Sequence, residues 1–580
     1  MKIPHAAPSG GNLRWEVAGL AVLSLVVLGA SWGLRGPWPP DEQVYALIAR
    51  DMLFSGDWLI PRVGGDIFQD KPPLLFWLMA LGYWLTHSIR YGFLLPVILS
   101  GVGTVLLVHD LARRLWGREA ALAAAALLLF TVHFTFQAQR GQMDGLLTFW
   151  LTATTYCLLR FLFLDGRWYW YGLAGIAAGL GILTKVVGFI PFFLVCLYAL
   201  AVWMRWPGTR AGATPLWLWP VAPLLMIAVV CAWLLPLLHL INAEGTPQLL
   251  AYRDELLFQQ TVTRFRTPWH HIQPWYYYLV TIATQWLPFA ALLPWLWPHW
   301  RDALRKRDTV VLSLLCLTVA VLVAFSCSAG KRDVYILPVL PCAILAAAPY
   351  LLRIFDRPPV RWTLLAHSLL IGFGTLGAYL YLGQGDHLAQ LEHRDIGLHL
   401  DAMPLLMVAL ATLTVAGLTR VRHAPLGLMV ALLLTWLIIG RGIYPQLDAS
   451  RSGQALMQEV ERRVDPQLEL GLMEYHEQML WSATRSTVNF GHRRFREGQQ
   501  EQYDAARWLN AGGQRRLVIP VESAQPCFAN ARQTVLGHPE HAEWLLVSGM
   551  AEASCAERGH ESAARSYTPP PASWLAHPGR

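Results

Sequence analysis

The chain has 580 residues, of which 55% are hydrophobic and only 14% are charged, whereas soluble domains carry roughly 25% charged residues. This composition excludes an ordinary soluble protein for most of the chain. The net charge is +8, but the basic residues stand between apolar runs, which is typical of orientation in a membrane and not of a nucleic-acid-binding face. We therefore expect an integral membrane protein with no nucleic-acid partner.

Apolar runs follow one another along the first 443 residues. A helix needs about 20 apolar residues to cross a bilayer, and this criterion predicts about thirteen transmembrane helices. Their ranges are 14–33, 91–110, 119–138, 144–163, 168–184, 186–204, 216–241, 276–298, 309–328, 334–352, 362–382, 403–419 and 425–443. No small-residue cleavage signal is obvious after the first run, so we expect it to be a retained anchor.

The run 72–85 is apolar but short, and whether it crosses decides the orientation of every later helix. If it does not cross and the N-terminus is cytoplasmic, every cytoplasmic loop is rich in arginine, as the positive-inside rule requires. These loops contain Arg113, Arg114 and Arg118; Arg160 and Arg167; Arg205 and Arg210; Arg301, Arg305, Lys306 and Arg307; Arg353, Arg357 and Arg361; Arg420 and Arg422. We therefore predict an interfacial or re-entrant segment at 72–85 and periplasmic loops at 35–90 and 242–275.

The segment 444–580 is polar and is predicted to be a soluble periplasmic domain. Residues 454–463 and 499–510 have the pattern of helices, and 468–473, 517–521 and 544–547 have the pattern of short strands. We expect a small α/β domain docked on a transmembrane part that spans 1–443, with a disordered tail at 569–580. Two cysteines of this segment could form a disulfide in the periplasm, and the sequence leaves that pairing open: Cys527 and Cys555.

Charged and polar side chains gather in the predicted external loops. A charge at membrane depth costs ~3 kcal/mol on insertion scales, so it usually has a function or a partner. Acids and bases at one membrane face suit a reaction in which cations bind phosphate and a carboxylate accepts a proton. The residues concerned are Asp41, Glu42, Asp70, Lys71, Asp144, Lys185, Arg264, Arg266, His270, His271, Lys331, Arg332 and Tyr335.

The use of lysine favours a phosphate site. The chain has only five lysines among its 46 basic residues, and three of them, Lys71, Lys185 and Lys331, fall in these external turns. Because lysine is a compact point charge, its retention there suggests phosphate ligands. The alternative is that each lysine extends to the lipid headgroups.

The acids and histidines each allow more than one interpretation. Asp41 is a candidate general base, but it could also be a carboxylate that only starts a helix. Asp144 could likewise be a helix-end cap, and Glu42 fits a structural pairing with a nearby base. His270 and His271 could bind metal or shape a donor site; adjacent histidines alone are weak evidence for metal, so we favour shaping. A cofactor is not identified, and a divalent metal stays open.

Six motifs in this order resemble the GT-C superfamily of membrane glycosyltransferases, and especially the protein O-mannosyltransferases and aminoarabinose lipid A transferases. DKPP or LTK alone is weak, but six motifs on one membrane face form a specific pattern. They are PPDEQVYALIARDM at 39–52, QDKPPLLFWL at 69–78, an Asp at 144 before a span, LTKVVGFIPF at 183–192, RF…HHIQPWYYYL at 264–279 and SAGKRDVYILPVLP at 328–341.

The resemblance implies a sugar donor on undecaprenyl phosphate and inversion at the sugar carbon. Asp41 would be the general base or would orient the acceptor, and Asp144 would help place the acceptor or a metal. The donor phosphate would be bound by Asp70, Lys71, Arg264, Lys331 and Tyr335. This chain departs from the aminoarabinose pattern at two positions, Val44 in place of an arginine and Asp70 in place of a glutamate. The phosphate site is therefore expected to draw on Arg264, Arg266 or Arg332.

We thus predict a glycosyltransferase of the bacterial inner membrane, with its active site at the periplasmic face. The sugar would be 4-amino-4-deoxy-L-arabinose, and the acceptor lipid A or a related envelope glycan. A protein O-glycosyltransferase is the alternative within the enzyme class. A transporter or flippase of a lipid-linked saccharide is the alternative outside it, although transporters place ionisable residues near the bilayer midplane. A non-catalytic scaffold would leave the acids and bases without a purpose.

Overall fold

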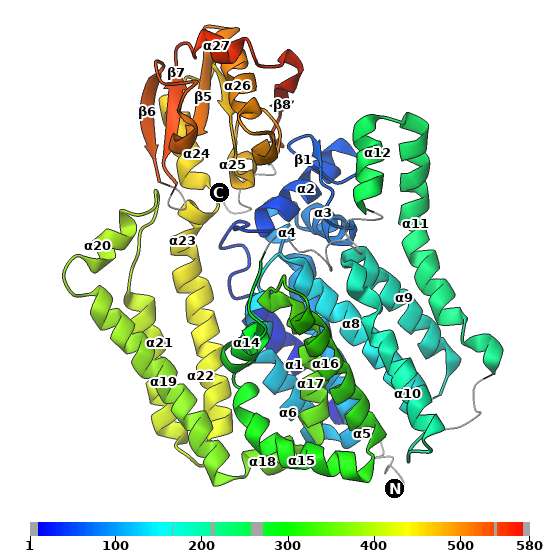
Figure 1. The fold of residues 1–580 in the computed structure, drawn as a ribbon. Coiled ribbons are helices and arrows are strands. Elements are labelled where there is room, and N and C mark those ends of the chain that lie inside the picture. The colour runs from blue at the N-terminus through cyan, green and yellow to red at the C-terminus, as the bar shows by residue number, and fades with distance from the viewer. Residues whose placement is uncertain are drawn as a thin grey trace.

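The protein is a bundle of long helices beneath a small α/β domain, and the segment 35–90, predicted to be the first external loop, lies between the two (Figure 1). This computed structural model describes residues 10–164, 166–209, 215–256, 271–492, 494–538 and 542–571. Arg264, Arg266, His270 and most of the predicted disordered tail lie outside the described residues.

The part before the α/β domain consists almost wholly of helices. They are α1 (Gly10–Leu28), α2 (Glu42–Ser55), α3 (Leu74–Thr86), α4 (Ile89–Gly92), α5 (Leu95–Trp116), α6 (Arg118–Leu129), α7 (Val132–Ala138), α8 (Met143–Leu159), α9 (Trp168–Thr184), α10 (Phe193–Trp203), α11 (Val221–Glu244), α12 (Pro247–Asp254), α14 (Tyr277–Gln285), α15 (Leu293–Lys306), α16 (Thr309–Cys327), η6 (Asp333–Val339), α17 (Leu340–Ala347), α18 (Leu351–Phe355), α19 (Pro358–Leu382), α20 (His387–Glu392), α21 (Met403–Thr419) and α22 (Ala424–Ile438).

The helices confirm a polytopic α-helical membrane protein. Among the described residues, eight helical stretches are long and apolar enough to cross a bilayer, or up to ten if each of two bent pairs is one span. Every predicted run contains helix, but the number of crossings, thirteen, stays a prediction. Helix α3 has 13 residues and is therefore about 20 Å long. It is too short for a hydrocarbon core of about 30 Å, as expected for an interfacial or re-entrant segment.

Two predicted spans are not the straight helices that we expected. Helices α6 and α7, over 119–138, meet at 65°, and α14 and the helical stretch that begins at Ala290 meet at 98°. Pro288 lies at the second bend and has no N–H to continue the helical ladder. The two bends contact each other, because the N–H of Val132 donates a hydrogen bond of 2.8 Å to the carbonyl oxygen of Leu287.

The α/β domain is reached by a helix that passes the boundary expected at residue 443. Helix α22 continues through η8 (Ile439–Ile443) into α23 (Tyr444–Arg451). Beyond it stand α24 (Gln454–Arg463), β3 (Glu469–Leu472), α25 (Glu477–Ser482), β4 (Thr487–Asn489), α26 (Gln500–Asn510), β5 (Arg515–Pro520), β6 (Arg532–Gly537), β7 (Trp544–Ser548), α27 (Ala553–Ala556) and β8 (Arg565–Tyr567). Both predicted helices and all three predicted strands are therefore confirmed.

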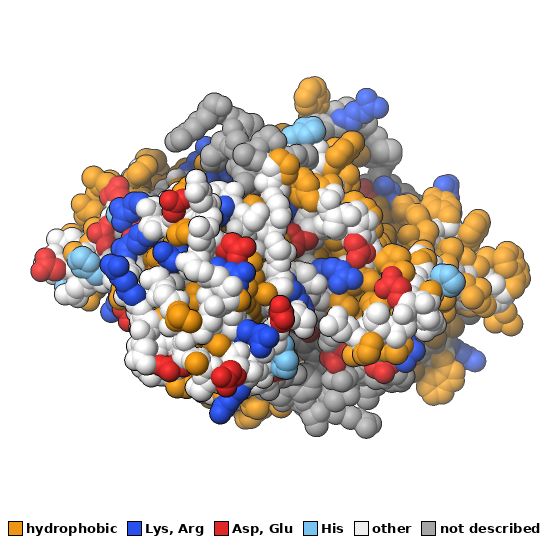
Figure 2. Space-filling model, turned by 90° about the horizontal axis from the view of Figure 1, so that it is seen from above, with side chains coloured by type: hydrophobic (Ala, Val, Ile, Leu, Met, Phe, Trp, Pro, Cys, Tyr) orange, Lys and Arg blue, Asp and Glu red, His pale blue; other side chains and the backbone are white. Residues whose placement is uncertain are grey.

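One six-stranded sheet forms the centre of this domain, in the order β6-β7-β5-β3-β4-β8. Strands β5, β3 and β4 are parallel, and the flanking strands β7 and β8 run antiparallel to them. Cys527 and Cys555 form a disulfide, with their Cα atoms 5.6 Å apart. Seen from above, charged and other polar side chains mix over this face of the molecule, and hydrophobic side chains gather toward the right-hand rim (Figure 2).

Candidate active site

Asp41 immediately precedes α2, in the first external loop. Arg332 Nη2 lies 2.8 Å from Asp41 Oδ2, and Gln142 Nε2 donates to the same oxygen at 3.3 Å. The arginine comes from the loop before η6, and the glutamine comes from the turn before α8. Three segments that are distant in sequence thus meet at one carboxylate, which is about a quarter exposed (24%).

Asp144 lies in the first turn of α8 and forms a second acid–base pair. Lys185 Nζ, just after the end of α9, lies 2.8 Å from Asp144 Oδ1. The same ammonium group stands 4.6 Å from the ring centroid of Tyr335. Three predicted site residues, Asp144, Lys185 and Tyr335, are therefore in direct contact.

Tyr45 is a buried neighbour of Asp41. It lies four residues after Asp41, in the first turn of α2, where its backbone N–H donates to the carbonyl oxygen of Asp41 at 3.2 Å, and only 6% of its surface is exposed. Burial and the carboxylates of Asp41, Asp144 and Asp70 raise the pKa of Tyr45 well above its usual value. The sequence analysis missed Tyr45, although its spacing from Asp41 could have indicated it.

Arg332 is the cation that pairs with Asp41. Burial lowers the pKa of Arg332, but the carboxylates of Asp41 and Asp144 raise it by more, so that the net change is an increase. The guanidinium group therefore stays charged at any physiological pH. Because Val44 stands where the aminoarabinose transferases have an arginine, Arg264, Arg266 or Arg332 was expected to supply the missing charge. In the described part of the structure, Arg332 is the one of these that lies beside Asp41.

Glu42 has the pairing with nearby bases that the sequence predicts. Arg35 contacts both of its carboxylate oxygens, at 2.5 and 3.0 Å, and Arg140 Nε lies at 3.2 Å. The N–H groups of Trp38 and Gly141 also donate to it. Burial would raise the pKa of Glu42, but the two arginines lower it to about 2. The buried ion pair with Arg35 fixes the chain just before and after Asp41.

A second anchor holds the segment that leads to Asp41. Asp448 on α23 accepts hydrogen bonds from the N–H of Gly36 at 2.7 Å and from Trp38 Nε1 at 3.0 Å. Asp448 also forms an ion pair with Arg90 in the short helix α4. The helix that supports the α/β domain therefore also holds the entry to α2.

Lys331 is buried and hydrogen-bonds to two loops. Its Nζ donates to the carbonyl oxygens of Ser328 at 2.5 Å and Gln273 at 3.1 Å. Its backbone N–H donates to the carbonyl oxygen of His271 at 2.9 Å. These bonds use two of the three N–H groups of the ammonium, so the predicted contact with the donor phosphate does not require it to leave the carbonyls.

Asp70 and Lys71 lie between the hairpin of β1 (Arg62–Val63) and β2 (Asp66–Ile67) and the start of α3. Both are partly buried, and Asp70 belongs to the acids that act on Tyr45. Within the described ranges, no group of three or more His, Cys, Asp or Glu side chains converges to hold a metal ion.

Comparisons with known proteins identify the family of the chain. The profile of the family described as dolichyl-phosphate-mannose-protein mannosyltransferase matches residues 70–236. This region includes Asp70, Lys71, Asp144 and Lys185, but not Asp41.

Named relatives match more of the chain. The undecaprenyl phosphate-α-4-amino-4-deoxy-L-arabinose arabinosyl transferase 2 of Pseudomonas fluorescens is 32% identical over 406 residues, which cover 65% of this chain and 65% of the relative. The match thus spans just under two thirds of that relative's length. The corresponding transferase of Pseudomonas paraeruginosa is 30% identical over 416 residues, which cover 70% of this chain and 71% of the relative.

Solved structures show the same fold. ArnT from Cupriavidus metallidurans bound to undecaprenyl phosphate has a TM-score of 0.71 at 19% identity, over 92% of this chain and 98% of that chain. The apo form of that protein has a TM-score of 0.70 at 20% identity, over 93% and 98% of the two chains. The present chain therefore belongs to the undecaprenyl phosphate-α-4-amino-4-deoxy-L-arabinose arabinosyl transferase family of membrane glycosyltransferases.

Proposed function

We propose that the protein transfers 4-amino-4-deoxy-L-arabinose from undecaprenyl phosphate to lipid A, at the periplasmic face of the bacterial inner membrane. The names of the relatives support the donor. The resemblance to the aminoarabinose lipid A transferases supports the acceptor. The observation that carries the proposal is the pairing of two carboxylates, Asp41 and Asp144, each with a cation from a distant part of the chain.

The position of the site supports its assignment to the periplasm. The site lies at the upper end of the bundle, near α2, whereas α15 and α18, which adjoin arginine-rich loops, lie at the lower end (Figure 1). Arginine-rich loops face the cytoplasm. The α/β domain stands at the same end as the site and contains the disulfide Cys527–Cys555, and disulfides persist in oxidising compartments such as the periplasm.

The chemistry requires charge stabilisation and a proton acceptor. An acceptor oxygen attacks the sugar carbon that bears the phosphate, and the bond from that carbon to the phosphate oxygen breaks with its electron pair staying on the phosphate. Lys71, Lys185 and Arg332 are the described cations that we assign to this developing charge, because preorganised cations stabilise it strongly. Asp41 accepts the proton that the acceptor oxygen carries.

Donor binding would also release the base. In the structure Asp41 is paired with Arg332, which covers part of the carboxylate. A phosphate group is a strong partner for a guanidinium group. The donor phosphate therefore competes with Asp41 for Arg332 and leaves the carboxylate accessible to the acceptor.

Mass spectrometry tests the proposal. Purified protein in lipid nanodiscs is incubated with undecaprenyl phosphate-linked aminoarabinose and lipid A, and the lipid A mass should rise by one pentosamine. Lipid A from cells with and without the gene should differ in the same way. An unmodified lipid A together with a glycosylated peptide would contradict the proposal and favour protein O-glycosylation, the activity in the description of the matching profile.

A further inference from the structure

The last strand of the α/β domain contacts the first external loop through two side chains. Arg565 and Tyr567 are two residues apart on β8, which pairs only with β4 in the described sheet and so forms its edge. Alternate residues of a strand point to the same face. Each of the two side chains reaches a different arm of the loop, and each arm leads to different residues of the candidate active site.

Tyr567 holds the arm that contains Asp41. Its hydroxyl donates to Asp51 Oδ1 at 2.9 Å and accepts a hydrogen bond from Arg50. Arg50 is fully buried on α2, and its guanidinium group also donates to the carbonyl oxygens of Leu480 and Trp481, at 2.9 and 3.0 Å. Arg50 lies nine residues after Asp41, which is about 14 Å along a helix.

Arg565 holds the arm that contains Asp70 and Lys71. It forms an ion pair with Asp66 in the β1–β2 hairpin, only four residues before Asp70. Asp66 also accepts a hydrogen bond of 2.7 Å from the N–H of His492, which follows β4. About one third of the Arg565 side chain is exposed. The ion pair therefore lies at the edge of the domain, where β8 ends the sheet, and it holds the hairpin there.

The hairpin turn is matched closely to the domain. Asn489 Nδ2 on β4 donates to the carbonyl oxygen of Gly64 at 3.2 Å. Gly64 has a φ of +56°, and a Cβ atom there would lie 2.4 Å from the hydroxyl of Tyr475. The turn therefore lies against the domain with no room for a side chain.

We propose that Arg565 and Tyr567 are positioning residues for the transfer reaction, and that the α/β domain acts as a clamp on the two arms of the first loop. The inference rests on the proposed function. A displacement of about 1 Å in a catalytic group can cost about 100-fold in rate, and neither arm is a long helix of the bundle that could hold its own place. The clamp adds to the contacts by which Glu42 and Asp448 hold the start of α2.

The two arms predict two different kinetic effects. Tyr567→Phe keeps the aromatic ring, whose centroid lies 5.7 Å from the Arg50 guanidinium group, but removes the hydroxyl. It should therefore loosen the arm that contains Asp41. We expect kcat to fall about tenfold, with the KM for the undecaprenyl phosphate-linked donor unchanged. Arg565→Ala loosens the arm of Lys71, and we expect that KM to rise about tenfold with a smaller effect on kcat.

Two controls separate positioning from folding. Ser566 lies between the two residues, points to the opposite face of β8 and is exposed, so Ser566→Ala should leave both constants within twofold. The charge-reversed pair Asp66→Arg with Arg565→Asp restores the ion pair with the opposite polarity. It should recover at least half of the donor affinity that Arg565→Asp alone loses. Equal effects of Tyr567→Phe and Arg565→Ala on kcat and KM, or no recovery in the reversed pair, would overturn the clamp.

Hydrogen exchange tests the clamp without the reaction. In nanodiscs that contain undecaprenyl phosphate, Tyr567→Phe should increase amide exchange over 41–50, and Arg565→Ala should increase it over 64–72, at a melting temperature close to that of the wild type. If wild-type protein transfers no aminoarabinose but these segments respond as expected, the proposed function fails and the clamp stands. If transfer occurs and the exchange of both segments is unchanged, the clamp fails alone.

Discussion

Arg332 donates a hydrogen bond of 2.8 Å to Asp41, although the two residues are 291 positions apart in the sequence. The arginine precedes η6 and the aspartate precedes α2, so the pair exists only when the late and early parts of the bundle are packed together. It places a cation and the proposed base at one point.

Replacing the proposed base should abolish transfer without unfolding the protein. Asp41→Asn keeps the shape of the side chain and can still accept a hydrogen bond from Arg332, but it cannot take a proton. Because general base catalysis contributes roughly 100- to 10,000-fold, we expect kcat to fall by at least about 100-fold. The assay is pentosamine transfer to lipid A in nanodiscs, with the melting temperature as control. Near-normal turnover would remove Asp41 as the base.

Removing the cation should weaken donor binding instead. Arg332→Gln keeps a hydrogen-bond donor near Asp41 but loses the charge, so the Kd for undecaprenyl phosphate should rise about tenfold or more. Isothermal titration or native mass spectrometry measures this Kd. Arg361, whose partner Asp356 is 79% exposed and adjoins the predicted cytoplasmic side, provides the control substitution Arg361→Gln. Equal loss of affinity in both variants would contradict a specific role for Arg332.

The buried pair of Glu42 and Arg35 should be essential for stability. Both side chains are almost fully buried, at 0% and 1% exposed. Glu42→Gln leaves the Arg35 charge without a carboxylate, and breaking a buried pair in this way costs about 3–5 kcal/mol. Thermal unfolding in detergent should show a large loss. Asp302→Asn, which breaks an exposed pair with Lys306, should change stability by less than about 1 kcal/mol.

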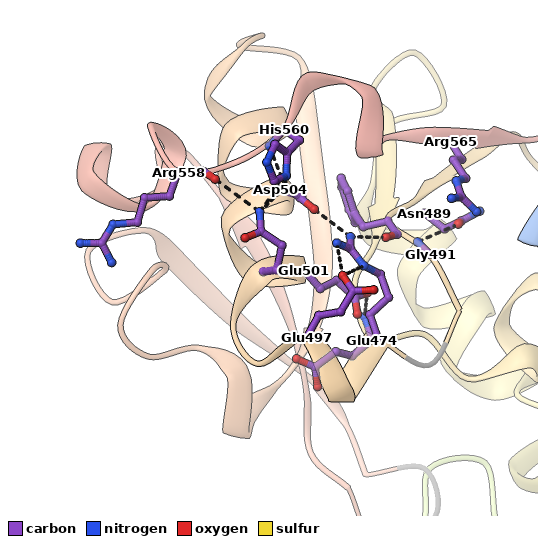
Figure 3. A network of polar contacts seen from close by, with 12 residues as sticks. Glu474, Asn489, Gly491, Glu497, Glu501, Asp504, Arg558, His560 and Arg565 are labelled. Atoms are coloured by element: carbon purple, nitrogen blue, oxygen red, sulfur yellow. Dashed lines mark hydrogen bonds and ion pairs between the residues drawn. The ribbon is translucent and has the colours of Figure 1, made fainter. Parts of the chain in front are cut away.

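Glu501 should make the stability of the α/β domain depend on pH. It accepts a hydrogen bond of 2.7 Å from the N–H of Glu474 within the polar network of this domain (Figure 3). Burial, together with the Glu474 carboxylate, raises its pKa from 4.5 to about 7. Between these two values the folded state binds a proton that the unfolded state does not, so stability rises as the pH falls from about 7 to about 4.5.

Glu501→Gln tests this expectation because glutamine resembles the protonated acid. The variant should be more stable than the wild type at pH 8, and the difference should vanish near pH 4.5. The measurement is the melting temperature across this range. Glu497→Gln is the control, because Glu497 is half exposed and paired with Arg494. A wild-type melting temperature that does not change between pH 5 and 8 would contradict the assigned role of Glu501.

Much of the fold was predictable because it follows from local patterns. Apolar runs predicted the helices, and alternation predicted the strands β3, β5 and β7. The bend near Pro288 was visible as a proline, but its size was not, because it depends on the packing of α6 and α7 against it. The continuation of helix beyond residue 443 was not predicted, because the residues there are polar and Asp448 contacts the segment before α2, which is distant in sequence.

The site was predictable as a set of residues but not as a set of pairs. Asp41, Asp144, Lys185 and Tyr335 were recognised as unusual charges or polar groups at one membrane face. Their partners depend on packing between segments that are distant in sequence, as with Arg332 and Asp41. The burial of Arg35 could not be predicted, because nothing in its immediate sequence distinguishes a buried arginine from an exposed one.

The hydrogen bond from Val132 to Leu287 makes the two helix breaks depend on each other. A bilayer offers no water to satisfy an exposed amide, so each interruption is tolerable only while it is shielded from lipid by its counterpart. Straightening one of them by substitution would strand a polar backbone group of the other. The two irregular spans should therefore have been inherited together, and a change in one is expected to require a compensating change in its neighbour.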